Sequence, residues 1–76
     1  METYTGKVYD LDFIQSSDWC QALLRNGEGD QNIVVITSDI RMQSILTTGL
    51  IMDHEVEVTY DAKDDNRLTR AKINFG

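Results

Sequence analysis

Polar and apolar side chains alternate through residues 7–14, KVYDLDFI, with the two-residue period of a half-buried strand. The alternation separates two faces, one with Tyr9, Leu11 and Phe13 and the other with Val8, Asp10, Asp12 and Ile14. Residues 32–36, NIVVI, form a β-branched run instead, which is typical of a well-buried strand. The pattern therefore predicts two strands, separated by a stretch that needs a closer argument.

That stretch, residues 16–25 with the sequence SSDWCQALLR, fits either a short helix or a strand. A helix capped by Ser17 would stack Trp19 on Leu23 one turn apart. It would be short, because the turn-forming residues NGEGD follow at once, and a short helix nucleates poorly. We therefore favour the strand.

As a strand, the stretch lines one face with Cys20, Ala22 and Leu24 and turns Trp19, Gln21 and Leu23 the other way. Asn26–Gly27 then forms the hairpin turn that leads into residues 32–36, since Asn-Gly between two strands is the strongest short hairpin signal.

From residue 37 the apolar positions take the period of a helix, through TSDIRMQSILTTGLIM. The stripe spaced i, i+3, i+4, i+7, i+8 consists of Met42, Ile45, Leu46, Gly49 and Leu50. Ser38 or Asp39 can cap the start, where the helix dipole favours a carboxylate. Gly49 can end the helix, or cost up to about 1 kcal/mol inside it unless a strand packs closely there. We predict that the helix runs to Met52 and stops at Asp53–His54, because Leu50 completes the stripe.

Two further alternating segments follow, residues 54–60, HEVEVTY, and residues 67–75, RLTRAKINF, joined by the polar turn DAKDDN. The inward side chains of the first are Val56, Val58 and Tyr60. The second carries Thr69, Ala71, Ile73 and Phe75 on one face, and Arg70, Lys72 and Asn74 on the other. The turn departs from a calcium-binding loop, with Lys63 in place of an acidic ligand and Asn66 in place of glycine.

The predicted order is strand, strand, strand, helix, strand, strand, in a single domain of residues 1–76. This order resembles the OB-fold, a five-stranded Greek-key barrel whose helix lies between the third and fourth strands. We therefore expect a mainly β protein with an OB-like barrel. An SH3-like or otherwise wound five-stranded barrel is the alternative, and a helical segment at 16–25 would favour an α+β sandwich.

Composition leaves such a barrel with a thin core. A chain of 76 residues buries about 60–65% of its unfolded surface. One cysteine cannot form an internal disulfide, and one histidine with one cysteine cannot complete a zinc site. Association with other chains is the remaining way to bury more surface, so we expect a homo-oligomer.

The net charge and the absence of targeting signals limit which classes of partner are expected. Thirteen acidic residues against seven basic ones give a net charge of -6, which repels nucleic acid. The first residues, METYTGKVYD, lack the charged-then-apolar pattern of a signal peptide, and no apolar run reaches membrane-spanning length. We expect a cytoplasmic chain whose partners are proteins rather than nucleic acid or membrane.

Acidic residues fall on the first and fourth predicted strands, which are neighbours in an OB-like barrel. The carboxylates expected to share an outer surface are Asp10, Asp12, Glu55 and Glu57. Four carboxylates at strand spacing can hold a hard cation or meet a basic partner. A solvated face explains them more simply, with Arg70 and Lys72 offsetting the repulsion by about 0.2–1 kcal/mol per cross-strand pair. We therefore predict an acidic surface and no metal site.

Basic residues concentrate on the last hairpin, which carries Lys63, Arg67, Arg70 and Lys72. OB-folds bind oligonucleotides across their second and third strands, with aromatic side chains stacking on the bases. Here those strands supply Trp19 and Arg25, and the basic hairpin lies at the edge of the same surface. A small-ligand or oligonucleotide site on this face is the alternative function.

Catalytic chemistry finds little support. Cys20 would need a general base, and nothing in the sequence places His54 beside it. Cysteine is among the most commonly buried residue types, and His54 is most simply a residue at the helix terminus. Glycine-rich phosphate loops, paired-cysteine motifs and the common hydrolase motifs are absent. We predict no catalytic residues and no cofactor.

A contact surface is the function that the apolar positions favour. If Cys20 faces the core, Trp19 and Leu23 face outward beside Arg25, as tryptophan often does at interfaces. A register shifted by one residue would bring Trp19 to the end of the barrel instead, and the sequence leaves both placements open. The residues predicted to form the contact are Trp19, Leu23, Arg25, Val8 and Ile14.

The segments WCQALLRNG, IVVITSDIRMQSIL, EVEVTYD and LTRAKI resemble short uncharacterised proteins encoded by the mobile gene cassettes of bacterial integrons. The resemblance spans most of the chain and assigns no site residue. It implies a bacterial or environmental origin and a tendency to self-associate. Together with the apolar positions, it leads us to expect a non-catalytic binding module that associates with itself.

Overall fold

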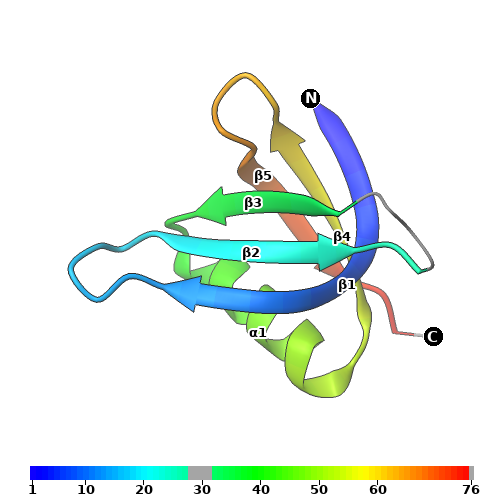
Figure 1. Ribbon diagram of the computed structural model, residues 1–76. Coiled ribbons are helices and arrows are strands. Elements are labelled where there is room, and N and C mark those ends of the chain that lie inside the picture. Colours follow the sequence, from blue (N-terminus) through cyan, green and yellow to red (C-terminus); the bar gives the residue numbers. More distant parts are fainter. Residues whose placement is uncertain (28–31, 76) are drawn as a thin grey trace.

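Five strands in the order β1-β2-β3-β5-β4 close into a barrel, with one helix between β3 and β4 along the chain (Figure 1). The computed structural model describes residues 1–27 and 32–75. The predicted architecture, an OB-like barrel with the helix after the third strand, is confirmed. The elements are β1 (Glu2–Phe13), β2 (Cys20–Arg25), β3 (Ile33–Thr37), α1 (Ile40–Met52), β4 (Glu55–Asp61) and β5 (Arg67–Ile73).

The stretch at residues 16–25 is a strand rather than a helix, as predicted, although β2 begins only at Cys20. β2 and β3 pair as the predicted hairpin, but β3 begins only at Ile33, and Gly27 has a positive φ of 51° whereas Asn26 does not. Asn26–Gly27 therefore do not form the predicted hairpin turn by themselves, because that turn needs a positive φ at both residues. The turn-forming cluster NGEGD extends to residue 30, and residues 28–31 lie outside the described residues.

The longest strand, β1, has two neighbours in succession. Its residues 2–7 pair antiparallel with β4, and its residues 7–13 pair antiparallel with β2. Gly6 lies at the crossing, where a Cβ atom would stand 2.5 Å from the carbonyl oxygen of Arg25. Only glycine allows this approach. The sequence pattern placed the start at residue 7 and missed the first half of the strand, because its threonines and glycine show little alternation.

A β-bulge interrupts β1 between Val8 and Asp10. Tyr9 is the extra residue, so the two-residue period changes phase there. Val8 is therefore 6% exposed and belongs to the core, and the prediction that it is a surface contact is wrong. Tyr9 and Phe13, which the alternation placed opposite Val8, are 59% and 55% exposed.

A second bulge lies in the β4–β5 pair, where the register shifts between Thr59 and Tyr60. Leu68 pairs with Tyr60 and is buried, whereas Thr69 is exposed, so the prediction that Thr69 shares one face with Ala71 and Ile73 is wrong. Ala71 and Ile73 share a face, as predicted, and that face packs against the core. Phe75 follows the end of β5 and is exposed, which corrects its predicted place on the same face as Ala71 and Ile73.

The core fills the barrel with small and medium apolar side chains. It consists of Val8, Ala22, Leu24, Val35, Leu46, Val56, Val58 and Leu68. Cys20 is buried as well, with 1% of its surface exposed. The predicted inner faces of β2 and β4 are thus confirmed.

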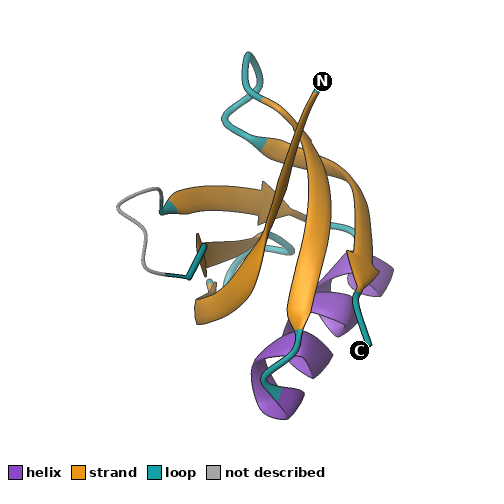
Figure 2. Ribbon diagram, turned by 90° about the vertical axis from the view of Figure 1, so that its right-hand side faces the viewer, coloured by secondary structure: helices purple, strands orange, loops and turns teal. Residues whose placement is uncertain are grey.

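Helix α1 lies across one end of the barrel (Figure 2) and contacts β1, β4 and β5. Its predicted limits are confirmed, because Asp39 caps the start and Asp53 ends it in the left-handed conformation. Gly49 is buried, and a Cβ atom there would stand 2.7 Å from Val56 Cγ1, so a side chain of β4, rather than the expected strand backbone, is the close neighbour. Leu50 is 38% exposed, which corrects its place on the inner stripe. At 3.6 residues per turn it stands about 80° around the helix from Met42.

Across the two described ranges, no helix combines the length and apolar character that crossing a membrane requires.

Candidate interaction face

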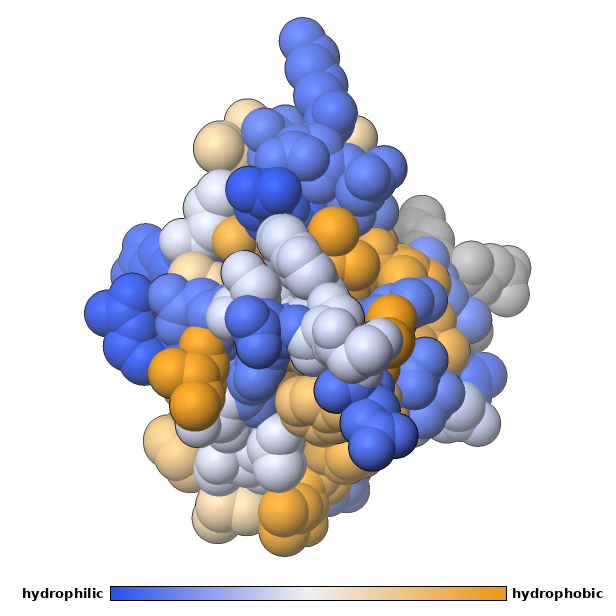
Figure 3. All heavy atoms as spheres, turned by 90° about the vertical axis from the view of Figure 1, so that its left-hand side faces the viewer, coloured by the Kyte–Doolittle hydropathy of each residue, from blue (hydrophilic) through white to orange (hydrophobic). Residues whose placement is uncertain are grey.

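The outer surface of β2 and β3 carries apolar side chains that the barrel leaves uncovered, and we call it the β2–β3 face. It consists of Ile14, Trp19, Leu23, Val34 and Ile36. Ile14 and Val34 are 51% and 41% exposed, and the other three are half-buried. The face fronts the viewer in Figure 1 and lies at the right of Figure 3, where apolar atoms gather between hydrophilic ones.

This face forms because successive side chains of a strand point to opposite sides of the sheet. Cys20, Ala22 and Leu24 point inward on β2, so Leu23 between them points outward. On β3, Val35 is buried and its neighbours Val34 and Ile36 face out. The sequence argument missed Val34 and Ile36 because a strand that is apolar on both faces gives no alternation. Leu23 could have indicated them, because it is an apolar residue at an outward position of the strand that pairs with β3.

Trp19 sits at one end of the face, immediately before β2. Its backbone N–H donates to Ser17 Oγ at 3.1 Å, which fixes the turn that precedes the strand. The guanidinium carbon of Arg67 lies 5.0 Å from the centre of the indole ring, within cation–π range. The ring also borders a small depression of about 70 Å³, shared with Ile14 and Ile36. Trp19 is therefore a half-buried residue of the outer wall, which agrees with the outward placement rather than the shifted register.

Opposite charges flank the apolar centre of the face. One cross-strand row, which we call the charged row, runs through Asp12, Gln21, Ile36 and Arg67. Strand spacings of about 4.8 Å separate its acidic and basic ends by about 14 Å. The next row also begins with a carboxylate on β1. In it, Asp10 pairs with Leu23, and Leu23 pairs with Val34. The face thus carries carboxylates along β1, apolar side chains with Gln21 among them over β2 and β3, and the guanidinium of Arg67 at the start of β5, where it also pairs with Asp64.

Arg25, a predicted contact, lies at the far end of β2, and the structure does not bring it to Trp19. Six residues of strand separate the two, about 20 Å. The guanidinium carbon of Arg25 lies 4.6 Å from the centre of the Tyr9 ring, which the bulge turns outward. Lys7 and Glu55 line the same open depression, and Lys7 is held by Asp53 at 3.2 Å. Positive and negative side chains are therefore mixed on this surface, and neither charge predominates.

The four predicted surface carboxylates do not form one cluster. Asp10 and Asp12 lie opposite β2, whereas Glu55 and Glu57 lie opposite Lys7 and Thr5 at the other half of β1. At least three residues of β1, about 10 Å, separate the two pairs. Within the described ranges, no group of three or more potential ligands could hold a metal ion.

The basic hairpin places its four residues in different surroundings. Lys63 belongs to the turn, where its backbone N–H donates to Asp61 Oδ1 at 3.0 Å. Lys72 lies opposite Glu57, as the predicted charge offset required, whereas Arg70 lies opposite Thr59. Arg67 reaches the β2–β3 face through its contact with the indole of Trp19.

Cys20 and His54 are placed apart from each other in the fold. Burial, and secondarily the negative charge of Asp12, raise the pKa of the Cys20 thiol, which disfavours the nucleophilic thiolate. His54 follows the C-cap of α1, where its backbone N–H donates to Gly49 O at 3.1 Å. Its ring packs edge-on against Phe75 at 5.1 Å. Cys20 thus lies among core residues, and His54 lies at the end of the helix beside Phe75.

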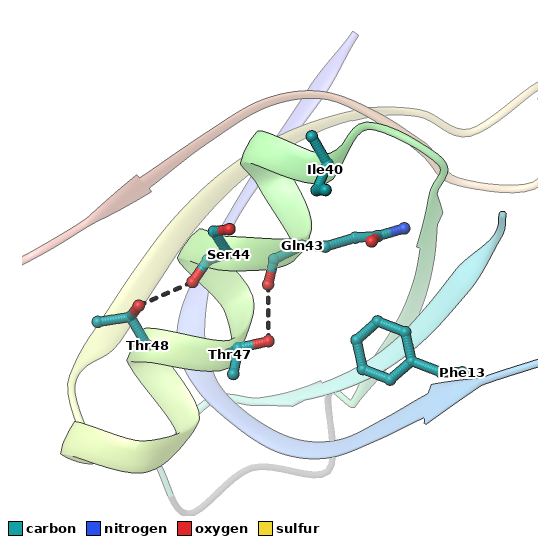
Figure 4. Close-up of a pocket in the computed structure, with 6 residues that line it drawn as sticks. All are labelled: Phe13, Ile40, Gln43, Ser44, Thr47 and Thr48. Atoms are coloured by element: carbon teal, nitrogen blue, oxygen red, sulfur yellow. Dashed lines mark hydrogen bonds between the residues drawn. The ribbon is translucent and has the colours of Figure 1, made fainter.

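A shallow groove of about 310 Å³ runs between α1 and the end of β1 (Figure 4). Its lining residues are Phe13, Ile40, Gln43, Ser44, Thr47 and Thr48. The Thr47 and Thr48 hydroxyls donate to the backbone carbonyl oxygens of Gln43 and Ser44, each at 2.8 Å. None of these side chains is charged, and the hydroxyls of Thr47 and Thr48 are already engaged by the helix backbone.

Comparison with protein-family models, with curated proteins and with solved structures returns no match to this chain.

Proposed function

We propose that this chain is a small, non-catalytic binding module that associates with a second copy of itself through the β2–β3 face. The observation that carries the proposal is the contiguous row of uncovered apolar side chains beside the only tryptophan of the chain. Apolar patches with polar rims mark interaction surfaces, and tryptophan is enriched among the residues that dominate binding free energy.

The small size of the barrel supports a protein partner that buries this row. An isolated core of this size supplies only about 3–5 kcal/mol of net stability, so burial of further apolar surface stabilises the fold substantially. The resemblance to integron cassette proteins implies the same tendency to self-associate.

Two features of the face favour a protein partner over the small-ligand or oligonucleotide alternative. The depression beside Trp19 measures about 70 Å³, whereas sites for small molecules occupy about 300–1,000 Å³. Asp10 and Asp12 border the apolar row, and they would repel a phosphate backbone.

Trp19 reports directly on the proposed contact, because the chain has no other indole. As the native protein is diluted and dissociates, we expect its fluorescence emission to move to longer wavelength, since water reaches the ring. Leu23→Glu introduces a charge at the centre of the face and should give the dissociated spectrum at every concentration.

Ile51→Glu is the matched control, because Ile51 is 76% exposed on α1 and lies outside the face. It should keep the behaviour of the native protein. Identical emission spectra for the native protein and the Leu23→Glu variant at all concentrations would contradict the proposal.

A further inference from the structure

We propose that the second copy docks on the β2–β3 face about a two-fold axis parallel to these strands, so that Asp12 of each copy meets Arg67 of the other. The inference rests on the proposed function, because it assigns the arrangement of that self-association. It follows from the order of charges across the face rather than from its apolar character alone.

A face with Asp10 and Asp12 on one flank and the Arg67 guanidinium on the other restricts how two copies can meet. Rotation by 180° about an axis along the strands lays the acidic flank of one copy on the basic flank of the other. Rotation about an axis across the strands lays acid on acid, which costs like-charge repulsion. In a chain with a net charge of -6, the first arrangement is the one that brings unlike charges together.

The same axis also matches the apolar centre. It lays β2 of one copy over β3 of the other, and therefore sets Leu23 opposite Val34 of the second copy. Both side chains are only partly covered within one chain. Trp19 and Ile14 then lie at one end of the contact. Because the interface is isologous, each contact occurs twice, including the pair between Asp12 and Arg67.

Both charged residues are available for this pair. Asp12 is exposed and, among the described residues, has no ion-pair partner. Arg67 is exposed, and its Nε contacts Asp64 Oδ2 at 3.2 Å. A guanidinium has five N–H donors, so the Nη groups can still receive a second carboxylate. The contact with Trp19 keeps this guanidinium on the β2–β3 face.

Charge reversal tests the arrangement through the variants Asp12→Arg and Arg67→Asp. Each variant alone sets like charges against each other twice, and we expect its dissociation constant to rise about tenfold or more. An equimolar mixture should form a heterodimer, because the first variant is basic at both positions and the second is acidic at both. The double variant Asp12→Arg/Arg67→Asp should dimerise with an affinity near that of the native protein. Sedimentation velocity of each sample, with one variant labelled by a fluorophore at its N-terminus, measures these affinities.

Arg70→Asp is the matched control, because Arg70 lies on the same strand but opposite Thr59, away from the face. It should dimerise alone and gain nothing from mixing with Asp12→Arg. Arg67→Glu is a second acidic variant that repeats the test if Arg67→Asp does not fold.

The outcomes separate the arrangement from the function. If Leu23→Glu dissociates the dimer but the mixture of reversed variants forms no heterodimer, the arrangement is overturned and self-association through the face stands. If the native protein is monomeric throughout, both are overturned. Recovery of the dimer in the mixture supports the arrangement, because a variant that had merely lost its fold would not recover.

Discussion

Trp19 and Cys20 are adjacent in the chain and opposite in surroundings. Trp19 lies on the outer wall beneath a guanidinium, and Cys20 is sealed inside the barrel with 1% of its surface exposed. This contrast follows from the strand period, and it separates the residue that can contact a partner from the one that cannot.

The burial of Cys20 leads to a prediction about thiol reactivity. Because burial raises its pKa and shields the sulfur, the folded protein should react with a thiol reagent only at the rate at which it opens. The measurement is the labelling rate in buffer compared with that in denaturant. Rapid, stoichiometric labelling of the folded protein would show that the site is open and would revive a reactive role for Cys20.

Asp39 leads to a prediction about acid stability. The side-chain hydrogen bond from Arg41, aided by the Arg41 backbone N–H, lowers the pKa of this carboxyl to about 2. The stabilisation is present above the pKa of an unfolded aspartate, about 3.9, and is lost as the pH falls toward 2. Asp39→Asn keeps a cap but cannot titrate, so the free energy of unfolding of this variant should fall less steeply with acid than that of the native protein.

Urea unfolding at several pH values measures this difference in slope. An equally steep fall in the native protein and the variant would show that Asp39 does not contribute to the acid dependence.

At the scale of elements, the limits of a helix or strand can be predicted best where a local residue signal marks them. The limits of α1 could be predicted because Asp39 is a strong cap and the helical stripe runs out at Asp53. The two bulges could not be predicted. Inserting Tyr9 or Thr69 changes which side chains face inward without changing the local alternation of residue types.

The β2–β3 face could likewise be predicted only in part, because local alternation does not show how distant strands meet. The pattern left the placement of Trp19 open, and the structure sets it beside Ile14 on the outer face that also carries Leu23. Val8 was misplaced by the bulge. Arg67 could not be joined to Trp19, because the contact depends on how β3 and β5 meet when the barrel closes, through the pairing of Ile36 with Arg67.

The crossing point of β1 leads to a prediction about closure of the barrel. In Gly6→Ala the new Cβ atom would meet the backbone of Arg25, which cannot move aside without opening the β1–β2 pairing. We expect the free energy of unfolding to fall by roughly 1–3 kcal/mol. Thr3→Ala, at an exposed position of the same strand, is the control and should change it by about 0.5 kcal/mol or less.

Urea unfolding of the two variants provides the comparison. Equal stability of Gly6→Ala and the native protein would mean that β1 does not pass Arg25 this closely.

At the scale of the whole molecule, a small barrel with a net charge of -6 leaves an apolar row in the middle of one wall. A standard interface buries about 800 Å² per partner. The single chain exposes 5049 Å², so pairing through the β2–β3 face would cover a substantial part of its surface. Charge repulsion between two copies opposes this, unless the flanks are arranged to bring Asp12 and Arg67 together.

Light scattering after size exclusion, across a dilution series of the native protein, tests self-association most directly. The account predicts a mass of about twice the 8.7 kDa of one chain at high concentration, falling toward the mass of one chain on dilution or in Leu23→Glu. A mass of one chain at every concentration would contradict it.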